Sequence, residues 1–379
     1  MFREGTKDGQ RGNIYFLTLT APSFGSPHHN RVERDGKAVP CHANPKVEKC
    51  IHGSSLVCGK IHDQKDDDLG SPLCTQCFDY ENAVLWNACS AKLWHVTIIQ
   101  IRRAIAKKLN LTEAKFRKFV KVEYVKVAEM QARCLVHFHV LLRVDLIADN
   151  PEIEKALSDT TLISNAILSG VKDSRFNPKL SDFKSGYKVE FAWGDQIKVR
   201  PVDSDELPKL ARYLSKYVTK SIADSYGMPR RISNIATVLS SSAPAHVKKM
   251  IQTAWKLGDE PALKVFKLPK WAHEFGFGGQ VVTKSHQFPM SFGELRQNRK
   301  DWAIRNRSAS TLLPDKEFFK EVKSIVHRGW KFIGDAIIVA SLGRKRAQMR
   351  RDAREARDYE AMERNGEFGS DESGDVQDE

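Results

Sequence analysis

The sequence lacks an apolar run long enough to cross a bilayer. Its longest candidate, residues 332–342, is short and interrupted by Asp335, whereas a membrane-spanning helix needs about 18 or more apolar residues. Residues 1–12 are polar and charged, unlike the apolar centre of a secretion signal. We therefore expect a cytoplasmic protein that has no membrane partner.

Acidic residues are too few to balance the basic ones. The formal net charge is +14 and the pI is about 9.4, which favours a polyanionic partner, although solvated surface lysines account for part of the excess. The chain of 379 residues is long enough for one large domain or two ordinary ones.

Cysteine is scarce, and five of the seven lie between Cys41 and Cys77. Clustering of this kind in a cytosolic chain indicates metal ligands more than disulfides, and the Cys-x-x-Cys knuckle within it suits a tetrahedral structural Zn²⁺. Cys41 and His42 are spares or part of a second site, and reduced, unligated thiols are the alternative. The predicted zinc ligands are Cys58, Cys74 and Cys77 with either Cys50 or His62.

Hydrophobic periodicity and turn residues predict an α+β fold. The elements follow in the order strand, helix, two strands, helix, strand, helix. This order corresponds to a split β-α-β layout with an antiparallel sheet, as in RRM and ferredoxin-like folds. The segments are 13–20, 79–109, 121–130, 135–144, 149–170, 187–193 with an alternative continuation at 196–199, and a helix that Pro208 opens.

Two histidines, His137 and His139, interrupt the apolar strand at 135–144. Because strand side chains alternate between faces, both imidazoles project from the face opposite the apolar side chains. With a hairpin turn near Arg133, Glu129 pairs with His137 and adds a carboxylate oxygen. Two imidazoles and a carboxylate suit a loosely held Mg²⁺ or Mn²⁺. The alternative is a pair of exposed or hydrogen-bonded histidines on an open sheet face.

The helix after Pro208 carries two tyrosines and two lysines on one face, within about 100° of arc. A tyrosine oxygen attacks poorly unless nearby cations or a metal favour the phenolate, and the lysines supply cations. An aromatic core stripe is the alternative. Together with the histidine pair, this helix is typical of an enzyme that cuts one DNA strand and holds its end covalently. The expected catalytic residues are Tyr213, Lys216, Tyr217 and Lys220.

Three segments resemble, in order, the motifs of HUH endonucleases: Phe16-Leu-Thr-Leu-Thr20, His137-Phe-His139 and Tyr213-x-x-Lys-Tyr-x-x-Lys220. More narrowly, residues 13–300 are similar to the rolling-circle replication initiators of actinobacterial plasmids, the RepSA type. The resemblance implies an HUH nuclease core with a zinc-binding insertion and a basic, aromatic C-terminal extension. It implies His137 and His139 as metal ligands and Tyr213 and Tyr217 as nucleophiles.

The resemblance also implies a reaction: metal-dependent nicking and rejoining of one strand at a plasmid origin, single-stranded or in a hairpin. A 5′-phosphotyrosine intermediate would leave a 3′-hydroxyl primer for a host DNA polymerase. Because the sequence has no Walker-type phosphate loop, the strand-separating helicase is expected to be a separate host protein. The alternatives are a two-tyrosine HUH transposase and a non-catalytic, zinc-containing regulator that binds the origin.

Composition predicts which residues contact DNA and how the chain divides into regions. DNA contacts are expected from basic residues that alternate with aromatic ones, and a small core with a charged surface is the alternative. These residues are Lys270, Lys284, Arg296 and Arg299. The expected divisions are a core at 1–225 with a cysteine-rich insertion at 26–78, an accessory DNA-binding region at 226–310, a helical basic region at 311–365 and a disordered acidic tail at 366–379.

Overall fold

The structure is a computed structural model that describes residues 13–32, 37–43, 45–63, 66–178, 190–207, 209–210, 213–214, 232 and 234–285. All of these belong to the first of two compact units, Met1–Ser291. The segments expected at 311–365 and 366–379 fall in the second unit, Phe292–Glu379, and lie outside the described residues.

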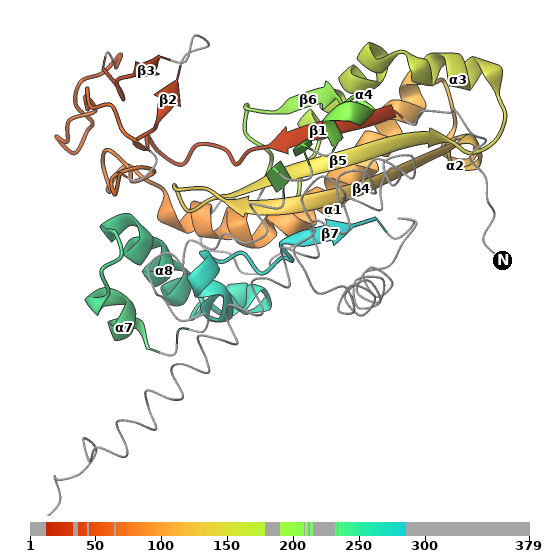
Figure 1. Cartoon of the computed structure of the whole chain (residues 1–379). Coiled ribbons are helices and arrows are strands. Elements are labelled where there is room, and N and C mark those ends of the chain that lie inside the picture. Colours follow the sequence, from red (N-terminus) through yellow and green to blue (C-terminus); the bar gives the residue numbers. More distant parts are fainter. Residues whose placement is uncertain are drawn as a thin grey trace, which may run out of the picture. The chain divides into compact units, whose positions relative to one another are not determined.

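A five-stranded antiparallel sheet lies at the centre of the described fold, with strands in the order β6-β1-β5-β4-β7 (Figure 1). The expected antiparallel sheet in a mixed α/β fold is therefore confirmed. Its last strand, β7, comes from the region expected to be accessory and pairs with β4. The strands are β1 Asn13–Leu19, β4 Val120–Met130, β5 Val136–Leu146, β6 Lys198–Pro201 and β7 Val282–Lys284.

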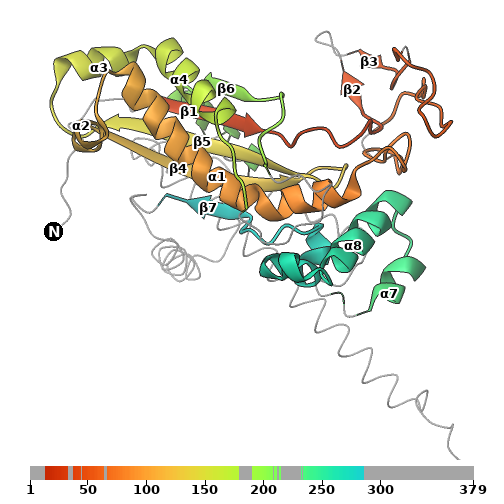
Figure 2. The same ribbon diagram turned by 180° about the vertical axis from the view of Figure 1, so that it is seen from behind.

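The long helix α1, Tyr80–Lys108, crosses one face of this sheet (Figure 2). Its first residue follows Asp79, whose carboxylate accepts a hydrogen bond from the backbone N–H of Asn82 at 3.1 Å, as expected of an N-cap. The other helices are α2 Glu113–Phe119, α3 Pro151–Ser158, α4 Thr160–Lys172, α7 Ile235–Ser240 and α8 Ala245–Leu257, with short 3-10 helices η1 Ser204–Glu206, η2 Pro261–Phe266 and η3 Leu268–Glu274.

Two of the expected elements differ from those observed. The single helix expected at 149–170 is two helices, because Asp159 ends α3 and its carboxylate accepts from the backbone N–H of Leu162 to begin α4. Residues 187–189 of the strand expected at 187–193 lie outside the described residues, and Phe191 makes only an isolated bridge with Phe176. The described strand of this region is β6, which overlaps the continuation predicted at 196–199.

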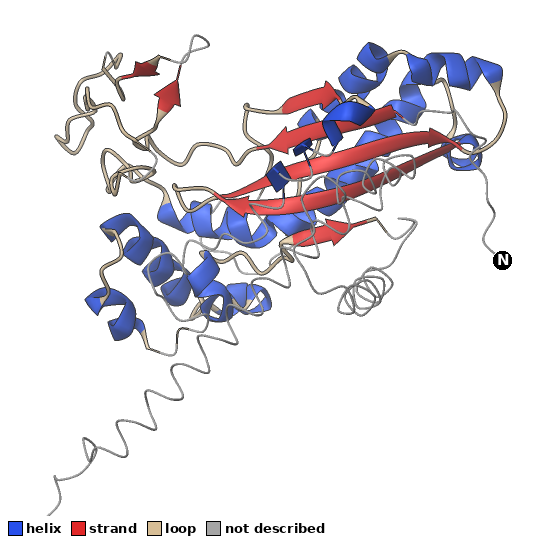
Figure 3. Cartoon of the chain, viewed as in Figure 1, coloured by secondary structure: helices blue, strands red, loops and turns tan. Residues whose placement is uncertain are grey.

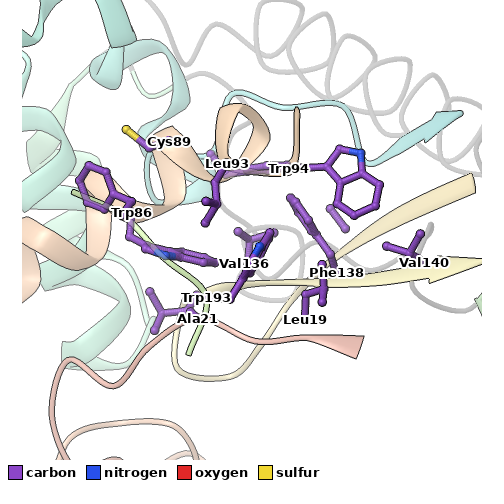
Figure 4. Packing of buried hydrophobic residues seen from close by; sticks show 14 of the residues in the cluster. Leu19, Ala21, Trp86, Cys89, Leu93, Trp94, Val136, Phe138, Val140 and Trp193 are labelled. Carbon is purple, nitrogen blue, oxygen red and sulfur yellow. The ribbon is translucent and has the colours of Figure 1, made fainter. Parts of the chain in front are cut away.

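The main core lies between α1 and the sheet. Phe138 of β5 contacts Trp193, while Trp86 of α1 packs edge-on against the same indole (Figure 4). Burial of such large rings contributes most to the stability of a core, at about 25 cal/mol per Å² of apolar surface. The alternate residues of β5 that carry this packing are Val136, Phe138, Val140, Leu142 and Val144.

The residues between β1 and α1 form mostly loops around a two-stranded sheet of β2 Arg31–Val32 and β3 Ala38–Val39 (Figure 3). This agrees with the loop-like insertion predicted at 26–78. Among the described helices, none has the length and apolar composition needed to span a membrane.

Candidate functional site

The hairpin of β4 and β5 brings the expected metal ligands together. The observed register pairs Glu129 with His137, as predicted. Since Phe138 points into the core against α1, the two imidazoles on either side of it project from the opposite face of the sheet.

The ligand atoms of Glu129, His137 and His139 all lie within 4.8 Å of one another. The Nε2 atom of His139 is 2.8 Å from Oε2 of Glu129. Two ligands held at right angles about 2.1 Å from one ion are separated by about 3 Å, so this spacing fits a shared Mg²⁺ or Mn²⁺. Two nitrogens and one oxygen are also a donor set that such ions accept.

Both imidazoles are buried, with 6% of His137 and 3% of His139 exposed. Burial, the neighbouring His139 and Arg133 lower the pKa of His137 to about 3. The ring is therefore neutral at pH 7, which is the protonation state that binds a metal.

A chain of hydrogen bonds orients His137. Nε2 of Gln131 lies 3.3 Å from Nδ1 of His137, and Arg133 Nε donates to Oε1 of Gln131 at 3.0 Å. Arg133 in turn donates to the carbonyl of Ala21, just after β1, at 3.1 Å. These contacts hold the His137 ring in one orientation.

Tyr213 is the expected nucleophile that the structure describes, and it lies beside the histidines. It is helical and 39% exposed, and its ring centroid is 5.5 Å from that of His139. Phe16 of β1 stacks on His139 at 5.7 Å and meets Tyr213 edge-on at 6.5 Å. The other expected catalytic residues, Lys216, Tyr217 and Lys220, lie outside the described residues.

Two basic residues at this site were not predicted from the sequence. The register of β1 and β6 places Lys198 opposite Thr18 and Arg200 opposite Phe16, so both belong to the histidine face of the sheet. Arg200 lies 5.7 Å from the centre of the Phe16 ring, and both basic residues are exposed. Their alternation within 196–201 was the available signal, but the predicted strand ended before Arg200.

The cysteines and histidines of the insertion form two separate four-residue groups. The single quartet predicted from Cys58, Cys74 and Cys77 is therefore not brought together, because Cys58 falls in one group and the knuckle in the other. His28 and His52 are members that sequence spacing did not identify, and Cys41 has a place in the first group. The groups are His28, Cys41, Cys58 and His62, and Cys50, His52, Cys74 and Cys77.

Of the expected DNA-binding residues, Lys270 is exposed with its Nζ 5.2 Å from the centre of the Trp271 ring, and Lys284 is half-buried in β7. Arg296 and Arg299 lie outside the described residues. The neighbouring Phe275 and Phe277 are buried in the core, which agrees with the alternative of a small core and leaves those rings unable to stack on bases.

Comparisons with known proteins agree on one family. A family model described as RepSA, "Replication initiator protein, pSAM2", matches residues 4–344. A replication initiator protein of Streptomyces ambofaciens is 29% identical over 353 residues, which cover 90% of this chain and 72% of that protein. No solved structure matches the chain.

Proposed function

Because this chain belongs to the RepSA family of replication initiator proteins, we propose that it nicks and rejoins one strand of a plasmid origin by tyrosine transesterification, in an HUH-type nuclease core. The observation that carries the proposal is the group of Glu129, His137 and His139 with Tyr213 packed against it. Replication initiation and transposition would share this chemistry, so the site alone does not separate them. Membership of the family favours replication initiation.

In the proposed reaction, a tyrosine hydroxyl oxygen attacks the phosphorus of one phosphodiester. The bond from phosphorus to the 3′ oxygen breaks, the tyrosine gives up its proton, and the 3′ oxygen gains one. The products are a 5′-phosphotyrosine and a 3′-hydroxyl that primes a host polymerase. Closure is the reverse transesterification, which conserves the bond energy and needs no ATP.

The residues of the histidine face have distinct roles in this scheme. Glu129, His137 and His139 would hold Mg²⁺ or Mn²⁺, which would polarise the scissile phosphate and offset negative charge on its oxygens. Gln131 keeps His137 in one orientation. Arg200 and Lys198 would bind DNA phosphates beside the tyrosine, because both are exposed cations on the histidine face of the sheet. Origin DNA is thus the proposed partner, with the helicase supplied by the host.

The test is a covalent-adduct assay with single-stranded oligonucleotides that tile both strands of the DNA flanking the gene, where an inverted repeat would mark the origin. A label on the 3′ end stays with the 5′-phosphotyrosine fragment and so moves with the protein on a denaturing gel. With Mn²⁺, the wild-type protein should form a labelled adduct on one oligonucleotide. Tyr213→Phe and Tyr217→Phe, made singly and together, assign the nucleophiles.

The matched control is Tyr124→Phe, which removes a tyrosine hydroxyl from the core side of β4. It should leave the adduct yield unchanged, while the double variant should form none. If the wild-type protein binds the oligonucleotide but forms no adduct, the protein is an origin-binding regulator and the proposal is wrong. If the double variant still forms the adduct, the nucleophile has been misassigned.

A further inference from the structure

We propose that residues 28–77 bind two structural zinc ions in a crossed arrangement, with each ion held by two ligand pairs that are separated in the chain. This inference is independent of the nicking chemistry. The first site is His28, Cys41, Cys58 and His62, and the second is Cys50, His52, Cys74 and Cys77.

The spacing of the ligand atoms fits tetrahedral zinc. Bonds of about 2.3 Å to sulfur and about 2.0 to 2.1 Å to nitrogen place two tetrahedral ligands about 3.3 to 3.8 Å apart. In the first site, Nε2 of His62 is 3.3 Å from Sγ of Cys58 and 3.1 Å from Nδ1 of His28. Cys41 completes it, with Sγ 3.8 Å from Nδ1 of His28.

The second site has similar spacing around one imidazole. Nδ1 of His52 is 3.2 Å from Sγ of Cys77 and 3.9 Å from Sγ of Cys74. Cys50 provides the third sulfur within the same group. The two sites therefore differ in composition: two sulfurs and two nitrogens in the first, and three sulfurs and one nitrogen in the second.

The hydrogen bonds of His62 show which of its nitrogens faces the ion. Its Nδ1–H donates to Oδ2 of Asp66 at 2.8 Å, so the lone pair is on Nε2, the atom that faces Cys58 and His28. A carboxylate on the far nitrogen is the usual outer partner of a zinc-bound histidine. Asp66 is thus a positioning residue for the first site.

Two nearby side chains compete less well for this site. His29 and His42 form an alternative three-residue group with Cys41, which is also a member of the first site. Nε2 of His42 lies 3.0 Å from the carbonyl oxygen of Pro27, which engages that ring with the backbone. The group with His62 has four ligands and an oriented imidazole, so Cys41 belongs with it.

The order of the ligands along the chain makes the arrangement crossed. The first and third pairs form one site, and the second and fourth pairs form the other. Each ion therefore closes a loop that contains a ligand pair of the other ion. The four pairs are His28 and Cys41, Cys50 and His52, Cys58 and His62, and Cys74 and Cys77.

The insertion needs such a constraint because it has little apolar core of its own. Ile51 is 94% exposed, Val47 and Ile61 are more than half exposed, and the described secondary structure is two strands of two residues each. A segment that buries so little apolar surface does not offset the entropy of ordering its loops. Metal binding to all four ligand pairs supplies that free energy.

The experiment uses the purified full-length wild-type protein. Elemental analysis should find two zinc ions per chain, and replacement with cadmium-113 should give two NMR resonances. One should lie in the range of three-sulfur sites and the other in the range of two-sulfur sites. Fewer than two bound zinc ions, or two resonances in one range, would overturn the proposal. Neither measurement depends on a variant that must fold.

Variants then test the crossed pairing. Cys58→Ser should change the two-sulfur resonance first, and Cys50→Ser the three-sulfur resonance. Cys89→Ala, a buried cysteine of α1 outside both groups, and His29→Ala should keep both ions. If Cys58→Ser instead alters the three-sulfur resonance, or if His29→Ala releases an ion, the assignment of ligands is wrong.

Discussion

The ring of Tyr213 lies edge-on against the imidazole of His139, with centroids 5.5 Å apart and planes at 81°. One residue comes from β5 and the other from a helical segment after β6. Phe16 of β1 contacts both rings, so three separate segments converge on one face of the sheet. A candidate nucleophile thus lies beside a candidate metal ligand.

Gln131 is expected to control metal affinity without contacting the ion. Gln131→Ala removes the side chain that contacts Nδ1 of His137 and holds the ring in place, and it should weaken Mn²⁺ binding about tenfold. Titration of Mn²⁺ followed by electron paramagnetic resonance measures the effect. Gln252→Ala, at a partly exposed position of α8, is the control. Equal affinities for the two variants would show that Gln131 has no such role.

Asn87 should be among the most sensitive positions for stability. Its side chain donates to the carbonyls of Cys134 and Phe275 and accepts from the N–H of Val136, so it joins α1 to the start of β5. Asn87→Leu leaves these buried groups unpaired and should lower the free energy of unfolding by about 3 kcal/mol. Urea denaturation measures this loss, with the exposed Lys92→Ala on the same helix as control.

Lys126 should make stability depend on pH. Burial lowers its pKa from 10.5 to about 7, with its Nζ 3.8 Å from the centre of the Phe138 ring. Between pH 7 and 10 the unfolded chain binds a proton that the folded chain does not, so stability rises with pH across this window. Lys126→Met should flatten that rise and stabilise the protein at pH 7 by on the order of 4 kcal/mol, from a pKa that falls from 10.5 to about 7 at about 1.4 kcal/mol per unit.

Urea unfolding at several pH values between 6 and 9.5 tests this prediction. The exposed Lys107→Met on α1 is the matched control and should leave the slope unchanged. A Lys126→Met protein whose stability keeps the wild-type pH dependence would show that another group is responsible.

Gly70 joins the insertion to the hairpin that carries the histidines. Its φ is +84°, and an added Cβ would lie 2.3 Å from the carbonyl carbon of Ala132 in the β4–β5 turn. Gly70→Ala should therefore destabilise the protein by about 2 kcal/mol or more. Gly53→Ala is the control, because its φ is +79° but nothing lies within 4 Å of the new methyl group. Equal losses would mean that the contact with Ala132 is unimportant.

The elements that could be predicted are those with short-range signals. Strand alternation and the turn near Arg133 were enough for the pairing of Glu129 with His137, because a hairpin register depends on few residues. The apolar spacing after Asp79 marked α1 almost to the residue.

The features that could not be predicted depend on the path of the chain in space. The grouping of cysteine ligands requires knowing how the loops cross, which spacing alone does not contain. The pairing of β7 with β4 joins residues far apart in sequence. Helix α2 was missed because its only buried residue is Phe116, which leaves no apolar periodicity to detect.

The most direct test of the account is the dependence of covalent adduct formation on Mn²⁺ in a histidine variant and its control. His139→Ala removes a proposed metal ligand, whereas His95→Ala removes an exposed histidine of α1. We predict that His95→Ala forms the 3′-labelled adduct at the wild-type rate, and that His139→Ala is slower by about 100-fold or more at the same Mn²⁺ concentration. An adduct that forms equally fast in both variants would contradict the proposed site.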